Sequence, residues 1–228
     1  MSRRSQAFSI NLCNLMIKFA FIKVGIGTSD ISRLGFFNNV TFRIGPDQFS
    51  FQDLEHGILR ANSKSPYTFI RSFGPKDDRL RLCMPKVDCR IHFALNCGAK
   101  SCPPVTNFTA EGLDHELRIV AQTFCEQDSN VEIKEKDMTL LLSELFKWYR
   151  NDFCSSSADS LPKAVLKYLR GNKKLTLERM LLKGPSSIKV KFLPYDWSTN
   201  ASNFKPFTGG SVKADSSRFL KSPLKRKD

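Results

Sequence analysis

The spacing of apolar residues changes along this chain, and the change limits the folds it can adopt. In residues 8–22 apolar side chains recur every three or four positions, as on one face of a helix. Around Gly45-Pro46-Asp47 they alternate, which predicts a hairpin with strands 40–44 and 48–51. The sequence therefore predicts an α+β fold, in which a small antiparallel sheet packs against an N-terminal helix and a helical region.

Further segments extend this pattern. Paired glycines, Gly25 and Gly27, predict the end of the first helix, whose core face carries Phe8, Leu12, Leu15, Met16, Phe19 and Ile22. A short apolar run stopped by glycine and paired prolines predicts a buried strand at 90–96. The remaining expected elements are helices at 53–60, 109–127, 143–153, 161–169 and 174–182, a ribbon of 131–133 with 138–141, a brief strand at 80–82, and a strand at 188–193.

Charge and length set the domain organisation. The 228 residues suffice for a hydrophobic core, and residues 1–200 are expected to form a single domain. The net charge is +14, and residues 201–228 carry seven Lys or Arg against two Asp, so this segment is expected to be a basic, disordered tail. No nucleic-acid-binding motif accompanies the charge, so nucleic acid is disfavoured as a partner.

The N-terminal segment resembles a signal peptide only in part. Arg3 and Arg4 precede an apolar run, but Asn11, Asn14 and Lys18 interrupt it and no cleavage pattern follows. No stretch is expected to span a bilayer, and no membrane partner is expected. An odd number of cysteines, seven, favours reduced thiols and a cytoplasmic location, with the nucleus as the alternative because the basic tail could act as an import signal.

The segment from His92 to Cys102 is the best candidate for chemistry. His92, Cys97 and Cys102 lie at the end of the expected strand and in the turn after it, where side chains commonly face a cleft. A cysteine is nucleophilic as its thiolate, which needs a nearby cation or imidazole, and His92 and Lys100 are local candidates. The amides of a turn that contains Gly98 could hold an oxyanion. These residues predict a Cys–His catalytic site.

Two other interpretations of the same residues stay open. Free cysteine is among the most buried residue types, so Cys97 and Cys102 could simply be packed in a core with a hydrogen-bonded His92. Zinc is a lesser alternative, with His56 as a fourth ligand, but the spacing of the two cysteines is only near that of zinc sites. No metal and no cofactor is expected.

Several other polar residues are candidates for binding. Glu55 and His56 could act as an acid–base pair, although adjacent helical positions point in different directions and a surface pair is the commoner arrangement. Asp196 could orient an imidazole or simply form a turn. Cys13 is expected to pack in the core. The binding residues are predicted to be Asn14, Glu55, His56, Asn96, Lys100 and Asp196.

Five blocks of sequence together resemble one known family, over residues from about 7 to 200. They are Gln6–Asn14, Leu54–Arg60, Ile91–Pro104, Lys147–Phe153 and Leu193–Trp197. In order and spacing they resemble the domain of unknown function 547 family (DUF547). The central fourteen-residue block is the most specific. Two departures are Ser9 and Cys13, where the family usually has an aromatic pair, and the lack of its preceding helical region, so that the chain is either truncated or has a less covered cleft.

The resemblance implies an α+β domain similar to papain-like or transglutaminase-like thiol hydrolases. On that basis His92 would be the imidazole, and Cys97 or Cys102 would be the reactive thiol. The expected function is a thiol hydrolase that acts on a peptide or protein. The alternative is a non-catalytic interaction or scaffold module. The sequence does not determine the substrate or the oligomeric state.

Overall fold

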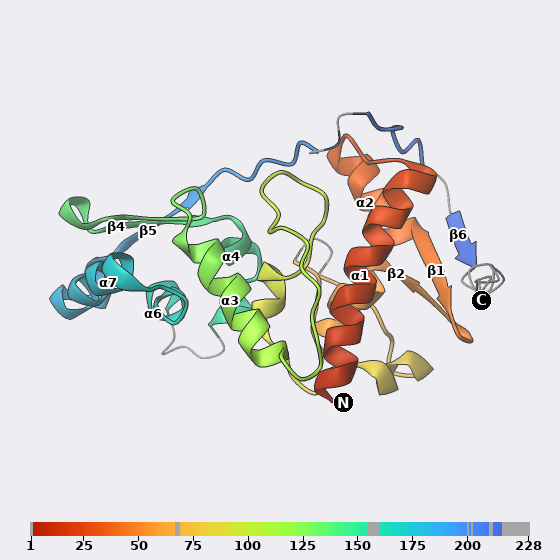
Figure 1. Ribbon diagram of the computed structural model, residues 1–228, viewed down its shortest axis with the longest axis horizontal. Coiled ribbons are helices and arrows are strands. Elements are labelled where there is room, and N and C mark those ends of the chain that lie inside the picture. The colour runs from red at the N-terminus through yellow and green to blue at the C-terminus, as the bar shows by residue number, and fades with distance from the viewer. Residues whose placement is uncertain are drawn as a thin grey trace, which may run out of the picture. The chain divides into compact units, whose positions relative to one another are not determined.

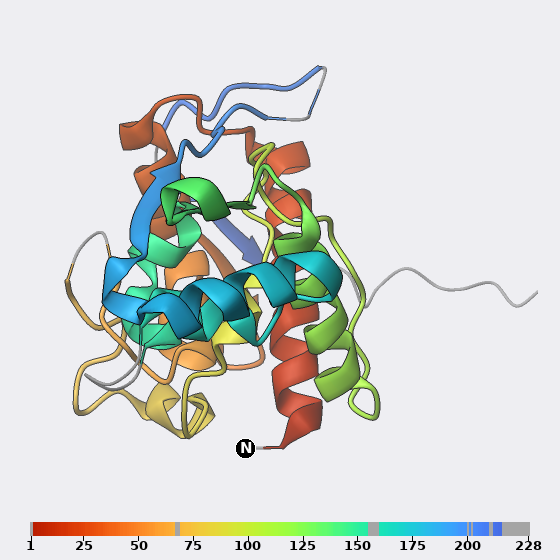
Figure 2. The same cartoon turned by 90° about the vertical axis from the view of Figure 1, so that its left-hand side faces the viewer.

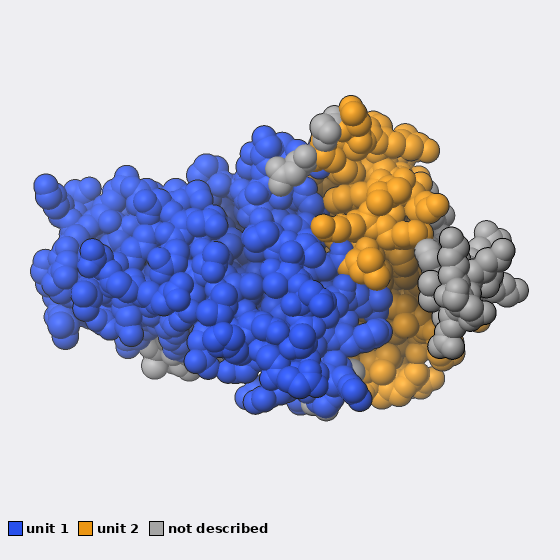
Figure 3. All heavy atoms as spheres, viewed as in Figure 1, with its two compact units in different colours: residues 1–14, 85–200 blue, residues 15–84, 201–228 orange. Residues whose placement is uncertain are grey.

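The computed structural model describes residues 2–66, 69–154, 160–199, 201, 203–209 and, for the backbone alone, 212–215. These residues divide into two compact units. The single domain expected over residues 1–200 stays a prediction. Unit 1 comprises residues 1–14 and 85–200, and unit 2 comprises residues 15–84 and 201–228 (Figure 3). Both units combine helices with a small sheet, so the predicted α+β class is confirmed.

Unit 1 holds a three-stranded sheet with helices beside it (Figure 1). Strands β3 (Val131–Lys134) and β4 (Thr139–Ser143) pair antiparallel, as the sequence predicted, whereas β5 (Lys189–Leu193) pairs with β4 in parallel. Helix α7 contacts β3 and is seen side-on in Figure 2. The helical elements are α3 (Leu113–Glu126), α4 (Leu145–Trp148), α5 (Arg150–Phe153), α6 (Leu161–Leu166), α7 (Gly171–Lys183) and the 3-10 turns η3 (Cys89–Phe93), η4 (Glu135–Asp137) and η5 (Pro185–Ser187).

Aromatic rings form the centre of the unit 1 core. The ring of Phe93 is fully buried and lies with its centroid 5.1 Å from that of Phe124, 5.7 Å from Phe146 and 5.6 Å from Phe153. Tilted and edge-on contacts of this kind are favourable beyond the burial of their area. Because Phe93 belongs to η3, this packing fixes the segment that carries the candidate site.

The predicted buried strand at 90–96 is wrong, since residues 89–93 form the 3-10 helix η3. The carboxylate of Asp88 accepts a hydrogen bond from the backbone N–H of Arg90 and caps this turn. The Arg90 guanidinium also binds the carboxylates of Asp88 and Asp114. Apolar periodicity cannot distinguish a short buried strand from a short buried helix, so the local cap determined the outcome.

Unit 2 contains the second sheet. Strands β1 (Val40–Ile44) and β2 (Asp47–Ser50) form the predicted hairpin, and Gly45 takes a φ of 62° in its turn. Helix α2 (Asp30–Asn39) begins with a capping box between Ser29 and Ser32. The π-helix η1 (Asp53–Leu59) and the 3-10 helix η2 (Asp78–Leu82) follow. The elements bring a cluster of phenylalanine rings together around Phe36.

Part of the expected disordered tail is ordered within unit 2. Strand β6 (Val212–Asp215) pairs in parallel with β1, and Pro206 forms a bridge with Ile26. The side chain of Phe207 is buried, and its ring lies edge-on to that of Phe36 with the centroids 5.5 Å apart. This packing differs from the expectation for residues 201–228. The rest of the basic tail, residues 216–228, lies outside the described residues.

Helix α1 (Arg3–Val24) ends where the glycines predicted, but it buries a different face. Of the residues predicted to face the core, Met16 is buried, but Phe8, Leu15 and Ile22 are 59%, 65% and 80% exposed, whereas Ala7, Ile10 and Ala20 are buried. By length and composition this helix could cross a membrane, contrary to the expectation, although 44% of its most apolar window is buried. Buried core helices and signal sequences also have such a composition.

Candidate functional site

The turn that follows η3 is held by two asparagines. Asn14 on α1 donates to the Ala94 carbonyl (2.9 Å) and accepts from the Asn96 N–H (3.0 Å). Asn96 in turn accepts from the Gly98 N–H (2.8 Å) and donates to the Pro103 carbonyl (2.7 Å). Gly98 has a φ of 87°, which favours glycine. The two predicted binding residues Asn14 and Asn96 therefore shape the loop.

A second segment of unit 1 closes the other side of this loop. The N–H groups of Lys100 and Ser101 donate to the carbonyls of Ser198 and Asp196, and Ala99 forms a bridge with Thr199. The Cys97, Gly98 and Cys102 amides also donate within the protein. These five amides of residues 97–102 are therefore already engaged, which does not fit the expected oxyanion-holding turn.

The loop brings the two cysteines into contact. Cys97 Sγ lies 2.8 Å from Cys102 Sγ, and both residues are half-buried. Cys102 Sγ also accepts from the Cys97 N–H (3.1 Å) and lies 3.2 Å from the hydroxyl of Tyr195, which is 3.8 Å from Cys97 Sγ. None of the seven cysteines is assigned to a disulfide bond. Of the two sulfurs, Cys102 has more hydrogen-bond donors close to it.

These donors make the two thiols unequal. The hydrogen bond from the Cys97 thiol, with further ones from Tyr195 and the Cys97 N–H, lowers the pKa of Cys102 to about 7 against the desolvation that would raise it. The same thiol–thiol contact, together with burial, raises the pKa of Cys97. Burial and the two thiols raise the pKa of Tyr195, so it stays a hydrogen-bond donor. Of the two sulfurs, Cys102 is therefore the one on which the thiolate form is favoured.

His92 forms a buried pair with an acidic residue. Its Nε2 lies 2.8 Å from Oδ2 of Asp152, and the two side chains are 1% and 6% exposed. The imidazole stacks on the ring of Tyr149 with the centroids 3.7 Å apart. Because a carboxylate accepts hydrogen bonds, Nε2 carries the proton at this contact. The sequence predicted that His92 would lie next to the thiols. The structure shows its Nε2 in contact with Asp152.

Two residues adjacent in the sequence pack near the imidazole and near the partner of the thiols. Tyr149 stacks on His92, and Trp148 lies edge-on to Tyr195 with the ring centroids 5.0 Å apart. Trp197 completes an aromatic cluster, 5.5 Å from Trp148 and 4.8 Å from Tyr195. All three members of this cluster are half-buried. The His92–Asp152 pair and the thiol pair are therefore attached to the same short segment of unit 1.

Lys100 and Asp196 lie at the rim of the loop. Asp196 accepts hydrogen bonds from the N–H (2.9 Å) and hydroxyl (2.6 Å) of Ser198, which lower its pKa, with a smaller effect from the charge of Lys100. Both residues are exposed. Asp196 therefore forms a turn, the second of the two roles expected for it.

Glu55 and His56 belong to unit 2 and lie on the π-helix η1. His56 is 2% exposed, so the expected surface location is wrong for this residue. Its Nδ1 lies 2.8 Å from Nη1 of Arg60 and 3.8 Å from Oε1 of Glu55. A guanidinium only donates, so Nδ1 is the acceptor of that bond. Gly57 allows close packing of η1, since a Cβ there would lie 2.5 Å from the Phe73 ring.

Metal-ligating groups do not gather in the part of the chain that the structure describes. No group of three or more His, Cys, Asp or Glu side chains in residues 2–66, 69–154 and 160–199 is placed to hold an ion. The zinc alternative required His92, Cys97, Cys102 and His56 as ligands. No such grouping supports it.

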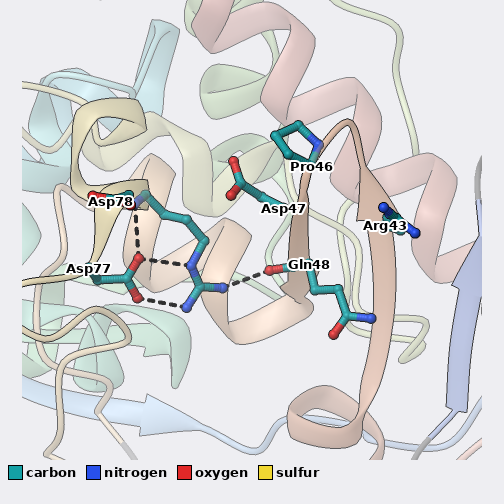
Figure 4. A pocket seen from close by; sticks show the side chains of 7 residues that line it. Arg43, Pro46, Asp47, Gln48, Asp77 and Asp78 are labelled. Atoms are coloured by element: carbon teal, nitrogen blue, oxygen red, sulfur yellow. Dashed lines mark hydrogen bonds and ion pairs between the residues drawn. The ribbon is translucent and has the colours of Figure 1, made fainter.

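A polar hollow of 610 Å³ lies on unit 2 between the β1–β2 hairpin and η2 (Figure 4). Its charged centre, Arg79, binds the carboxylates of Asp77 and Asp53 and the carbonyl of Gln48. Its guanidinium also lies 4.5 Å from the centre of the Phe73 ring. These contacts stabilise the fold. The hollow is lined by Arg43, Pro46, Asp47, Gln48, Asp77, Asp78 and Arg79.

Sequence reasoning missed Asp152 and Tyr195. Asp152 lies in the block Lys147–Phe153 and Tyr195 in the block Leu193–Trp197, and both blocks carried the family resemblance without a role. A carboxylate and a phenol inside such blocks are groups that could have been paired with His92 and the cysteines. Their sequence separation from the loop hid the pairing.

Comparison with protein families agrees with the resemblance. The profile of DUF547, described as a protein of unknown function, matches residues 1–125, more than half of the chain. The chain belongs to the DUF547 family. The match includes His92, Cys97 and Cys102 and ends before Asp152 and Tyr195. No curated protein and no solved structure matches this DUF547 chain.

Proposed function

We propose that this DUF547 chain is a thiol-dependent hydrolase of peptides or proteins, with Cys102 as its nucleophile. The observation that carries the proposal is the hydrogen-bonded Cys102 sulfur, next to Cys97 and Tyr195. These contacts stabilise the thiolate without a neighbouring lysine, and a thiolate is the reactive form in covalent catalysis. The resemblance to papain-like folds supports the same reaction class.

In this proposal the thiolate attacks an acyl carbon, the leaving group departs, and water then hydrolyses the thioester. Hydrolysis requires a group that transfers protons. His92 is the candidate, since Asp152 orients its ring, and Tyr149, which stacks on that ring, directly follows Trp148 of the aromatic cluster beside the thiols. The oxyanion would need donors other than the five engaged amides of residues 97–102.

An activated ester tests the proposal without a known substrate. With p-nitrophenyl acetate we expect a burst of nitrophenolate and an acetyl group on the tryptic peptide 101–118, which contains Cys102 as its cysteine. Cys102→Ser should abolish both, while the matched variant Cys83→Ser should retain them. His92→Gln should slow release of the acetyl group more than its formation. Acetylation spread over several cysteines, or unchanged in Cys102→Ser, would contradict the proposal.

A non-catalytic interaction module is the second candidate function. The internal hydrogen bonds of the loop amides favour it, because acyl transfer depends on free donors for the oxyanion. In this case the His92–Asp152 pair and the asparagines serve the fold alone. Acetylation of Cys102 at the rate of an unstructured thiol would support this function over hydrolysis.

We also propose a cytoplasmic location, with the nucleus as the alternative. Seven cysteines without an assigned disulfide bond fit a reducing compartment. Fractionation of cells that express a tagged chain would test this location.

A further inference from the structure

We propose that Cys97 and Cys102 form a two-electron redox site, which a peroxide oxidises to an intramolecular disulfide. This inference requires a nucleophilic Cys102 but no hydrolysis. It rests on the proposed function in one respect: disulfide formation would switch off the proposed hydrolase by consuming its nucleophile.

The geometry of the loop carries the inference. The two sulfurs are 2.8 Å apart, and a disulfide bond measures about 2.0 Å, so a small side-chain movement suffices to form it. Asn96 holds the loop through Gly98, which lies between the two cysteines, and through Pro103, which follows the second. The Cys102 N–H donates to the Ala99 carbonyl and closes the turn between the two cysteines. The thiols are therefore held in contact by backbone that need not rearrange.

The unequal surroundings assign a separate role to each sulfur. Cys102 accepts hydrogen bonds from the Cys97 N–H and from Tyr195, which suits the attacking thiolate. Cys97 remains protonated beside it, which suits the resolving thiol. Both are half-buried, so a small oxidant can reach them. Cys125, by contrast, is fully buried in the core of unit 1.

The reaction proceeds in two balanced steps. The Cys102 thiolate attacks one peroxide oxygen, the O–O bond breaks, and the other oxygen leaves as an alcohol or water after taking a proton. The Cys97 sulfur then attacks the resulting sulfenic acid, the S–O bond breaks, and the Cys97 proton leaves with the hydroxide as water. The two sulfurs are oxidised by two electrons, and one peroxide is reduced. A second dithiol, through exchange, would return both protons and both electrons.

Two features of this chain allow oxidation of the two cysteines to be detected directly. Lys100 lies between the cysteines, so trypsin separates peptide 91–100 from peptide 101–118 and the disulfide appears as a covalent link between them. Both tryptophans of the chain, Trp148 and Trp197, lie in the cluster with Tyr195. Their fluorescence therefore reports on the site without a label.

The experiment treats the reduced full chain with roughly one equivalent of hydrogen peroxide. We expect the linked peptides 91–100 and 101–118, a loss of two free thiols, a change in tryptophan emission, and reversal of all three by dithiothreitol. In Cys97→Ser, Cys102 should instead stop at the sulfenic acid, which dimedone traps. Cys102→Ser should yield neither product, and Cys83→Ser should behave as the unmodified chain.

The outcomes separate this inference from the proposed function. A linked peptide without acetylation by p-nitrophenyl acetate supports the redox site and contradicts the hydrolase. Acetylated Cys102 without a linked peptide, or oxidation of Cys102 directly to sulfinic acid, overturns the redox site and leaves the hydrolase standing. Equal peroxide sensitivity of Cys83 and Cys102 would also overturn the redox site.

Discussion

Unit 1 contains two polar clusters that differ in exposure. The His92–Asp152 pair lies in the interior, with both side chains less than a tenth exposed, between aromatic rings that include Tyr149. Cys97 and Cys102 lie half-buried in a loop beside Tyr195. The buried pair is largely withdrawn from solvent, whereas the thiols remain accessible to a small reagent.

The difference shows how two neighbouring clusters of one unit can have different roles, one in stability and the other in chemistry. A buried polar group is costly to leave without its hydrogen bond, so loss of a partner from the interior pair should mainly affect folding. The thiols contact each other and a phenol in a half-buried loop, so changes there should mainly affect reactivity. Four predictions test this contrast, in order of decreasing effect.

The largest expected effect is on stability. Asp152→Ala removes the carboxylate that lies 2.8 Å from His92 Nε2 in the interior, which should lower the free energy of unfolding by about 1–3 kcal/mol. Urea denaturation measures this change. Asp137→Ala, at an exposed carboxylate, is the control and should change stability by less than about 0.5 kcal/mol. An equal loss of stability in the two variants would show that the interior pair stabilises the fold no more than an exposed carboxylate does.

The second prediction compares Cys102 with Cys125. Burial raises the pKa of Cys125 far above its usual value, whereas hydrogen bonds lower that of Cys102. At neutral pH iodoacetamide should alkylate Cys102 at least about 100-fold faster, because the thiolate is the reactive form. The Cys102 rate should rise with pH to a plateau, with its midpoint at about 7. Mass spectrometry of each cysteine peptide gives both rates, and a midpoint near that of an unperturbed thiol would contradict the assigned thiolate.

The third prediction concerns Tyr195. Tyr195→Phe removes the hydroxyl 3.2 Å from Cys102 Sγ and keeps the ring that contacts Trp148. Because one hydrogen bond to the thiolate is lost, the pKa of Cys102 should rise and its alkylation near neutral pH should slow by about threefold to tenfold. The plateau rate at high pH should stay the same. A lower plateau would instead indicate a rearranged loop.

The smallest effect is expected for Lys100. The structure places Lys100 at the exposed rim, where its charge acts on Asp196, and Cys102 takes its hydrogen bonds from Cys97 and Tyr195. Solvent screens such a charge, so Lys100→Gln should alter Cys102 alkylation by less than about twofold. A tenfold loss would restore the local lysine as the activating group that the sequence suggested.

The sequence predicted the elements with a clear local signature. The hairpin around Gly45, the ribbon β3–β4 and the end of α1 before Gly25 depend on turn residues and glycines, whose effects act over a few positions. Residues 89–93 were predicted as a strand because a short continuous apolar run shows neither the period of a helix nor that of a strand. The buried face of α1 was also wrong, because many apolar residues of this helix compete for the core.

By itself, then, the sequence determined the α+β class, the family and the loop that carries Cys97 and Cys102, because glycine, proline and closely spaced motifs act locally. Only the tertiary structure decided the chemistry of that loop. It paired His92 with Asp152 and brought Tyr195 to Cys102 Sγ. Hydrogen bonds and burial set the protonation state of a thiol, and here several of them come from residues far away in the sequence.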